Sequence, residues 1–219
     1  EYSYGRQNFF PWVGEEHRAT REGVGLYDQT SYAKFLLQGP GAQAVLQRVS
    51  ANDLASPTGK VVYTQWLNPS GGIEADLTIT RIEDESFLVV TTAATRFRDF
   101  HFLKAAIGDD QAYLTDITSG LATLGIMGPR SRELMAELTS ADLSNEAFPF
   151  ATSQEIELGY AQVRAMRITY VGELGWEIYI PTEFSLHVFD EIMRAGQALD
   201  LRPCGFHAMA SCRLEKGYR

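Results

Sequence analysis

Cysteine, clustered histidine, long apolar runs and excess positive charge are all scarce or absent in this 219-residue chain. The two cysteines, Cys204 and Cys212, lack the Cys-x-x-Cys spacing of zinc or redox sites and provide no disulfide framework. We expect both to be reduced, partly buried thiols. The four histidines are scattered without the spacing of metal ligands, so we predict no metal site.

Membranes and nucleic acids are not expected partners. No apolar run approaches the roughly 18 residues that a membrane-spanning helix needs. Residues 1–6 contain no basic region followed by an apolar one, so we predict no signal peptide. The net charge of −9 disfavours nucleic acid and anionic membranes, although local arginines could still bind an anionic small molecule.

The composition is that of a folded protein. Hydrophobic residues make up 45% of the chain and charged residues 21%, enough to bury one large core or two small ones. Predicted helices and antiparallel strands occupy separate stretches rather than alternating as β-α-β units throughout. We therefore predict an α+β fold.

Two stretches share one layout of strand, Gly-Pro pair and helix. The first spans residues 34–48 around Gly39-Pro40, and the second spans residues 122–138 around Gly128-Pro129. Proline is well tolerated in the first helical turn, where its missing N–H has no partner in any case. The recurrence predicts an internal duplication.

Apolar periodicity predicts the remaining elements. A three-stranded meander is expected over residues 61–67, 76–82 and 86–92, followed by a helix from about Ala94 to Ala106. The second half is expected to contain strands at about 161–169 and 176–180, and a helix from about Phe184 to Leu199.

Two carboxylates stand beside glycine-rich turns that open into strands. Asp76 ends the segment Gly71-Gly-Ile-Glu-Ala-Asp76, and Glu177 lies in Tyr170-Val-Gly-Glu-Leu-Gly-Trp-Glu177. A carboxylate at the start of a strand often only accepts backbone N–H groups. Here the glycine turns and aromatic neighbours instead indicate a pocket for a flat heterocycle rich in N–H donors. Those neighbours are Tyr63, Trp66, Tyr170, Trp176 and Tyr179.

A possible dinucleotide motif fails its context test. The segment Gly39-Pro-Gly41-Ala-Gln-Ala44 matches G-x-G-x-x-A between a predicted strand and a helix. The fingerprint also needs an acidic residue about 20 positions later at the end of a second strand, and residues 56–59 are a predicted loop there. This disfavours nucleotide binding by the loop.

Five motifs together resemble the folate-binding aminomethyltransferase (glycine-cleavage T-protein) family. They occur in the family's order over almost the whole chain, at residues 16–28, 71–77, 126–129, 170–177 and 213–218. Residues 2–6 and 214–219 look more like the folate-binding region of dimethylglycine and sarcosine dehydrogenases. In those enzymes a flavin domain precedes this region, so the resemblance implies that FAD would bind that linked domain rather than this chain.

The resemblance also implies a detailed fold. We expect two intertwined subdomains with antiparallel sheets and ferredoxin-like halves, without the family's C-terminal barrel. Subdomain A would comprise about 1–54 plus 117–203, and subdomain B about 55–116 plus 204–219. We further expect the chain to be cut from a longer polypeptide at both ends.

The family's functional residues imply a tetrahydrofolate site. Glu177 matches the acid that grips the pterin ring, and Asp76 matches the catalytic acid. Asp76 would hold the attacking folate nitrogen, take its proton and stabilise a cationic iminium. The other candidates for folate contact are Tyr63, Tyr170, Ile178, Tyr179 and Arg213.

Two differences from glycine-cleavage proteins favour the dehydrogenase branch. Ala75 stands where those proteins commonly have the first of two paired acids, and Met209-Ala210 replaces an Arg-Asp pair. The implied function is transfer of a one-carbon unit, supplied as an iminium or formaldehyde equivalent from an oxidised N-methyl amine. Its product would be 5,10-methylenetetrahydrofolate.

Three alternatives stay open at this point. The chain could be a glycine-cleavage aminomethyltransferase, a non-catalytic folate-binding or assembly protein of the same fold, or a purely structural domain. The expected location is the cytoplasm in a bacterium or the mitochondrial matrix in a eukaryote.

Overall fold

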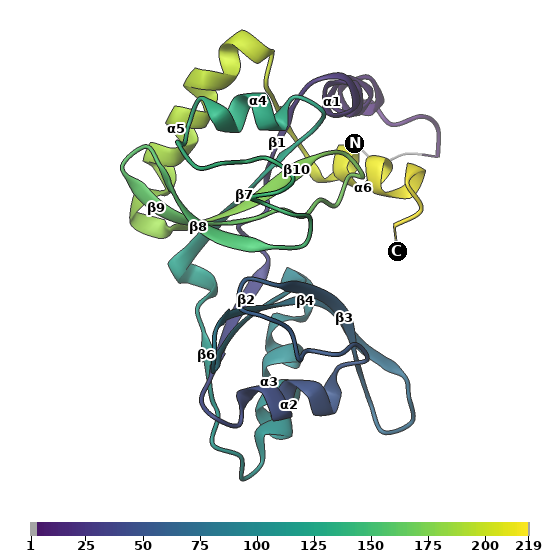
Figure 1. Cartoon of the computed structure of the whole chain (residues 1–219). Coiled ribbons are helices and arrows are strands. Elements are labelled where there is room, and N and C mark those ends of the chain that lie inside the picture. The colour runs from purple at the N-terminus through teal and green to yellow at the C-terminus, as the bar shows by residue number, and fades with distance from the viewer. Residues whose placement is uncertain (1–3, 219) are drawn as a thin grey trace. The chain divides into compact units, whose positions relative to one another are not determined.

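A computed structural model describes residues 4–218, which divide into two compact units (Figure 1). The first unit contains the described residues up to Gln29, then Thr123–Phe150 and the described residues from Glu155 onwards. The second contains Thr30–Ala122 and Ala151–Gln154. The family motif at residues 2–6 therefore lies partly outside the described residues, as does residue 219.

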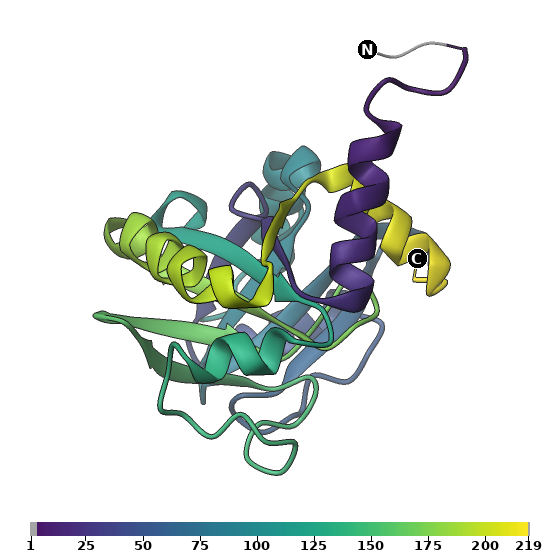
Figure 2. The ribbon, with the colours of Figure 1, turned by 90° about the horizontal axis from the view of Figure 1, so that it is seen from above.

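The first unit is built on a six-stranded sheet with the order β11-β1-β7-β10-β9-β8. Strand β1 runs parallel to β11 and antiparallel to β7. Helices α4 and α5 contact β10, and α1 packs beside α6 (Figure 2). Its elements are α1 (Phe10–Glu22), β1 (Gly25–Asp28), β7 (Leu121–Met127), α4 (Ser131–Ala136), β8 (Ser153–Leu158), β9 (Ala161–Met166), β10 (Gly175–Pro181), η3 (Thr182–Phe184), α5 (Ser185–Gly196), η4 (Gln197–Leu199), β11 (Arg202–Cys204) and α6 (Phe206–Glu215).

The second unit is built on a five-stranded sheet with the order β3-β4-β5-β2-β6, in which neighbouring strands pair antiparallel. Helices α2 and α3 pack against one another over a core that includes Phe35, Trp66 and Phe87. Its elements are β2 (Ala33–Gln38), α2 (Ala42–Val49), β3 (Val61–Leu67), β4 (Ile73–Glu83), β5 (Ser86–Thr91), η1 (Ala93–Thr95), α3 (Arg96–Ile107), β6 (Tyr113–Asp116) and η2 (Thr118–Gly120).

Both units repeat one βαββαβ pattern. In the second unit, β2-α2-β4-β5-α3-β6 gives the spatial order β6-β2-β5-β4, with β3 added at the edge. In the first unit, β7-α4-β9-β10-α5-β11 gives the same order, with β8 at the edge and β1 inserted between β11 and β7. This is the arrangement of a ferredoxin-like half, so the predicted α+β fold with two such halves is confirmed.

The two Gly-Pro pairs occupy equivalent places in that pattern. Gly39 follows β2 with φ of 120°, and Gly128 follows β7 with φ of 141°, a region that other residues rarely adopt. A Cβ at Gly39 would lie 2.5 Å from the carbonyl oxygen of Gln111, and one at Gly128 would lie 2.4 Å from that of Gly23. Glycine is therefore required where each strand turns into its helix.

The unit boundaries differ from the subdomains that the resemblance implies. Residues 30–54 belong to the second unit, because β2 forms ladders with β5 and β6 there. The segment from 204 onwards belongs to the first unit, because α6 packs against α1. The strand pairings, which the chain's apolar pattern does not specify, set this division.

Several element boundaries also shift. Strand β4 begins at Ile73 rather than at Asp76, because its hairpin with β3 extends back to the Leu67–Ile73 pair. Strand β9 ends at Met166 instead of about 169, and the helix expected over 184–199 is divided into η3, α5 and η4. Among the described residues, none of the helices is both long and apolar enough to span a membrane.

Replacing Gly39 tests the turn that the two units share. Gly39→Ala should lower the stability of the second unit by about 2–4 kcal/mol, since the new methyl group meets a backbone oxygen at a strained φ. Thermal and urea unfolding would measure the loss. Gly120→Ala is the matched control, because a Cβ there has no neighbour within 4 Å. Equal stability of the two variants would contradict this account of the turn.

Candidate functional site

Glu177 lies within β10 and is nearly inaccessible, with 7% of its surface exposed. Its Oε2 accepts a 2.7 Å hydrogen bond from the Tyr179 hydroxyl, and its Oε1 accepts a 3.3 Å bond from Nε2 of Gln29. Both donors are neutral side chains and both are buried. A buried carboxylate is retained in a fold only where hydrogen bonds compensate for its lost hydration.

Successive residues of β10 face opposite sides of the sheet. Glu177 and Tyr179 share one face, where they pair across the ladder with Met166 and Arg164 of β9. The side chain of Ile178 lies on the other face and is fully buried. Ile178 therefore does not join the side-chain cluster around Glu177.

Tyr170 and Arg213 come together near the same face. The Arg213 guanidinium carbon lies 5.9 Å from the centre of the Tyr170 ring, within range of a cation–π contact. Tyr170 also packs against a small buried cluster made of Tyr27, Met127, Val171, Met209 and Cys212. The sulfur of Met209 in turn lies 4.0 Å from Nε2 of Gln29. This chain of contacts connects Tyr170 and Arg213 to the surroundings of Glu177.

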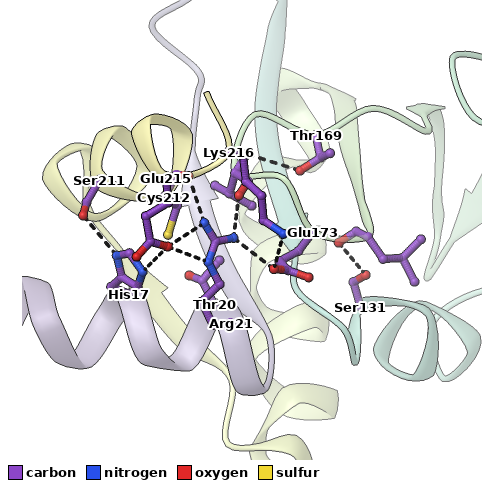
Figure 3. Close-up of polar contacts among 12 residues, drawn as sticks. His17, Thr20, Arg21, Ser131, Thr169, Glu173, Ser211, Cys212, Glu215 and Lys216 are labelled. Atoms are coloured by element: carbon purple, nitrogen blue, oxygen red, sulfur yellow. Dashed lines mark hydrogen bonds and ion pairs between the residues drawn. The ribbon is translucent and has the colours of Figure 1, made fainter. Parts of the chain in front are cut away.

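Arg21, at the end of α1, ties together the segments that carry these residues (Figure 3). Its Nη1 donates to the Val171 carbonyl oxygen at 2.6 Å and to Glu173 at 3.0 Å. Its Nη2 donates to the Cys212 carbonyl oxygen of α6 at 2.8 Å, and its Nε donates to Glu215 at 3.1 Å. One guanidinium thus fastens the glycine turn before β10 and the last turn of α6 to α1.

The network extends to His17 and Lys216. His17 contacts Ser211 through Nδ1 at 3.1 Å and Glu215 through Nε2 at 2.9 Å, while Lys216 lies 3.5 Å from Glu173. Arg21, with a further contribution from His17, holds the pKa of the Glu215 carboxyl below its ordinary value. The carboxylate is therefore charged, and fully paired, at neutral pH.

Asp76 belongs to the second unit and is exposed. The Tyr63 hydroxyl donates to its Oδ2 at 2.8 Å, and Nε2 of Gln65 donates to its Oδ1 at 2.9 Å. Its neighbours Ala75 and Leu77 point to the opposite side, into the core beneath α2 and α3. Asp76 and Tyr63 are thus brought together on the face of the sheet opposite to this core.

Neither acid stands at the mouth of its strand. Asp76 is paired with Gln65 inside the β3–β4 hairpin, and Glu177 is paired with Met166 inside the sheet of the first unit. Strand β4 already begins at Ile73 and β10 at Gly175, so both acids lie inside their strands. Since the acids belong to different units, their convergence on one ligand stays a prediction.

Comparison with known proteins assigns the family. The model of the GCVT N-terminal domain matches residues 1–219, the whole chain. This chain belongs to the GCVT N-terminal domain family.

The relatives of this GCVT domain include enzymes and a regulatory protein. It is 42% identical to 4-methylaminobutanoate oxidase (formaldehyde-forming) of Paenarthrobacter nicotinovorans, over 100% of this chain and 27% of that protein. It is 34% identical to the mitochondrial pyruvate dehydrogenase phosphatase regulatory subunit of Mus musculus, over 96% of this chain and 24% of that protein. It is 33% identical to the mitochondrial sarcosine dehydrogenase of Homo sapiens, over 100% of this chain and 26% of that protein. The chain therefore spans about a quarter of the length of these relatives.

A solved structure supports the same fold for this GCVT domain. The glycine cleavage system aminomethyltransferase T from Bartonella henselae matches with a TM-score of 0.83 at 25% identity. The match covers 94% of this chain and 55% of that one. The T-protein fold implied by the sequence motifs is confirmed.

Two residues of this GCVT domain were not identified from the sequence. Gln29 is 2% exposed and contacts Glu177, but it follows β1 with no motif to mark it. Arg21 lies inside a family motif, yet only the folded chain shows that it bonds segments about 150 and 190 positions away. A single sequence carries no local signal for either contact.

Metal and thiol chemistry receive no support at this site. Among the described residues, no three His, Cys, Asp or Glu side chains are grouped so that they could hold a metal ion. Both cysteines are free thiols, Cys212 buried and Cys204 partly so. Burial raises the pKa of the Cys204 thiol to about 11, so it stays protonated and poorly nucleophilic at neutral pH.

Removing Arg21 tests the network. Arg21→Met should destabilise the first unit by about 1–3 kcal/mol, because it strands two carbonyl oxygens and removes the charge opposite Glu173 and Glu215. The difference in unfolding free energy between wild type and Arg21→Met should shrink as the pH falls from about 4.3 through the lowered pKa of Glu215. The reason is that the ionised Glu215 carboxylate stabilises the folded state through Arg21 only above that pKa.

The matched control lies on the same helix. Arg18 forms no ion pair within residues 4–218, so Arg18→Met should change stability by less than about 0.5 kcal/mol. Urea unfolding from neutral pH down to below the lowered pKa of Glu215 measures both variants. Equal losses from Arg18→Met and Arg21→Met would show that the network contributes nothing specific.

Proposed function

We propose that this chain is a tetrahydrofolate-binding, one-carbon transfer domain of a flavin-linked enzyme that oxidises N-methylated amines. The observation that carries the proposal is the Glu177 carboxylate, which is buried at the sheet and accepts hydrogen bonds from the neutral side chains of Gln29 and Tyr179. Burying a charge this way is expensive for a fold and is most often found at functional sites.

The two acceptor oxygens of the Glu177 carboxylate fit the hydrogen-bond donors of a pterin. A pterin ring presents an N–H group and an adjacent amino group in parallel, and one carboxylate can accept both. Such a charge-assisted contact contributes about 1.5–3 kcal/mol. Tyr170 and Tyr179 would supply aromatic walls, and Arg213 a positive charge beside Tyr170. Ile178 could contribute only through its main chain, since its side chain lies on the other face of the sheet.

Asp76 would act on the reacting nitrogen. When bound, tetrahydrofolate supplies the amine nitrogens that accept the one-carbon unit. Tyr63 and Gln65 each donate to one Asp76 oxygen, which fixes the plane of the carboxylate. Asp76 would take the proton released from the nitrogen and stabilise the positive charge on the arriving carbon.

The relatives support an oxidative source for that carbon. One is named as a formaldehyde-forming oxidase of a methylated amino acid and another as a sarcosine dehydrogenase. In such an enzyme the flavin would reside on a covalently linked domain, and this domain would convert the released one-carbon unit to 5,10-methylenetetrahydrofolate. One of these relatives is bacterial and the other mitochondrial, which agrees with a cytoplasmic or a mitochondrial matrix location.

A non-catalytic role is the second candidate. A relative that matches 96% of this chain is named as a regulatory subunit rather than an enzyme. In that case Asp76 would be only a polar residue of the β3–β4 hairpin. A glycine-cleavage aminomethyltransferase is the nearest enzymatic alternative, given the fold match to that protein. The Met209-Ala210 pair favours the dehydrogenase branch over it.

Folate titration of the 219-residue chain tests the proposal. Glu177→Ala should abolish tetrahydrofolate binding in calorimetry, and Glu177→Gln should weaken it by about 10- to 100-fold, because a charged acceptor becomes half donor. Glu155→Gln is the matched control on β8, where the acid pairs with Arg164 at the surface. No binding by wild type, or equal binding by Glu177→Ala, would contradict the site.

Asp76→Asn separates catalysis from binding. The variant should keep affinity within about threefold, yet lose the rate of methylenetetrahydrofolate formation above the uncatalysed condensation of formaldehyde with tetrahydrofolate. Asp84→Asn, at the β4–β5 turn, is the control and should keep that rate. An unchanged rate in Asp76→Asn would favour the non-catalytic role.

A further inference from the structure

The Glu177 carboxylate is held from two sides before any ligand arrives. The Tyr179 hydroxyl contacts one oxygen and the Gln29 side-chain amide contacts the other. Tyr179 and Gln29 are 1% and 2% exposed, so neither can swing out to solvent. Tyr179 comes from β10 itself, whereas Gln29 comes from the chain just after β1, two strands away in the sheet.

Gln29 is an unusual residue to bury there. Its Nε2 donates to Glu177, but its Oε1 is buried without a hydrogen-bond donor among the described residues. The amide cannot turn over to improve this, because its oxygen would then face the carboxylate oxygen of Glu177. An apolar side chain of similar length would fill the space without an unsatisfied oxygen. The contact with Glu177 is what an apolar residue could not supply.

Gly125 makes room for this arrangement. It lies in the interior of β7, where glycine weakens a strand and usually marks a close approach. A Cβ at this position would lie 2.5 Å from Oε1 of Gln29 and 2.9 Å from Cε of Met127. The Gln29 backbone continues the ladder beside it, donating from its N–H to the Thr123 carbonyl oxygen at 2.9 Å. Gln29 and Gly125 are therefore complementary in shape.

We infer that Gln29 is a positioning residue for Glu177: it fixes the orientation of the carboxylate that would grip the ligand, and Gly125 keeps the space that Gln29 needs. The inference rests on the proposed folate function and deepens it. A carboxylate locked in place loses less freedom when the ligand binds, which raises affinity without a direct contact from Gln29.

Calorimetric titration with tetrahydrofolate tests this inference on the full chain. Gln29→Met should raise Kd about tenfold, because Glu177 loses a donor that orients it, while the melting temperature without ligand changes little, since the lost donor and the removed unsatisfied oxygen have opposite effects. Gly125→Ala should raise Kd in the same direction by displacing the Gln29 amide. Gly14→Ala is the control in the same unit, with no atom near its new methyl group, and should bind as wild type does.

Gln29→Glu provides a readout that a purely structural residue would not change. At neutral pH the introduced carboxylate should repel Glu177 and weaken binding. As the pH falls, the two acids share a proton, so the introduced carboxyl can donate as the amide does and affinity should recover. Gln29→Met has no such group, and its affinity should show no recovery at low pH.

The outcomes separate the two claims. The positioning role would be overturned if wild type and Gly14→Ala bind tetrahydrofolate and the Kd values of Gln29→Met and Gly125→Ala lie within twofold of theirs. The proposed function would then remain intact. An absence of binding by wild type would overturn the proposed function, and this inference with it. If Gln29→Met folds poorly, Gln29→Glu still tests the inference. A ratio of its Kd to the wild-type Kd that stays constant as the pH falls would equally overturn the inference.

Discussion

The Arg21 guanidinium is the interaction on which the site of the first unit depends. It satisfies main-chain oxygens at Val171 and Cys212 and side-chain carboxylates at Glu173 and Glu215. Without it, His17 would still connect α1 to α6 through Ser211 and Glu215, but the glycine turn that leads into β10 would lose its Arg21 bonds to α1. Since Tyr170 begins that turn and Arg213 lies on α6, Arg21 helps to place both residues. A lysine could not replace it, because one ammonium group cannot reach acceptors spread around a planar fork.

The strand geometry decides which residues can share a ligand. Because side chains alternate along β10, Glu177 and Tyr179 face one side of the sheet and Trp176 and Ile178 the other. Trp176 accordingly packs against Phe148 at a ring-centre distance of 6.2 Å, away from the carboxylate. Consecutive residues of a strand motif therefore cannot all place their side chains in one site. Only alternate positions, such as Glu177 and Tyr179, share a face of the sheet.

The sequence predicted those features that arise from local chemistry. The two Gly-Pro turns, the meander of the second unit and the strands around Glu177 depend on turn residues and apolar periodicity, which a single sequence displays. Gln29 and Arg21 could not be found in this way, because their roles come from contacts with residues far along the chain. The division of the chain into its two compact units is also set by contacts between distant residues. Whether β2 pairs with β5, or β1 enters the sheet beside β7, is decided by global packing rather than by local propensity.

Each unit carries one of the two acids, at places that are not equivalent in the repeated pattern, since Asp76 lies on β4 and Glu177 on β10. Their environments differ in a way that suits different roles. Glu177 is buried and held by donors from two strands of its sheet, so its geometry is fixed and it has little access to water. Such a group suits a steady grip on a ligand edge. Asp76 is exposed and held by Tyr63, which is itself 51% exposed, so its carboxylate is open to solvent. Catalysis needs a group that changes its protonation state, and binding needs one that does not. The proposed division of roles between the two acids therefore rests on burial, since Glu177 is buried and Asp76 is exposed.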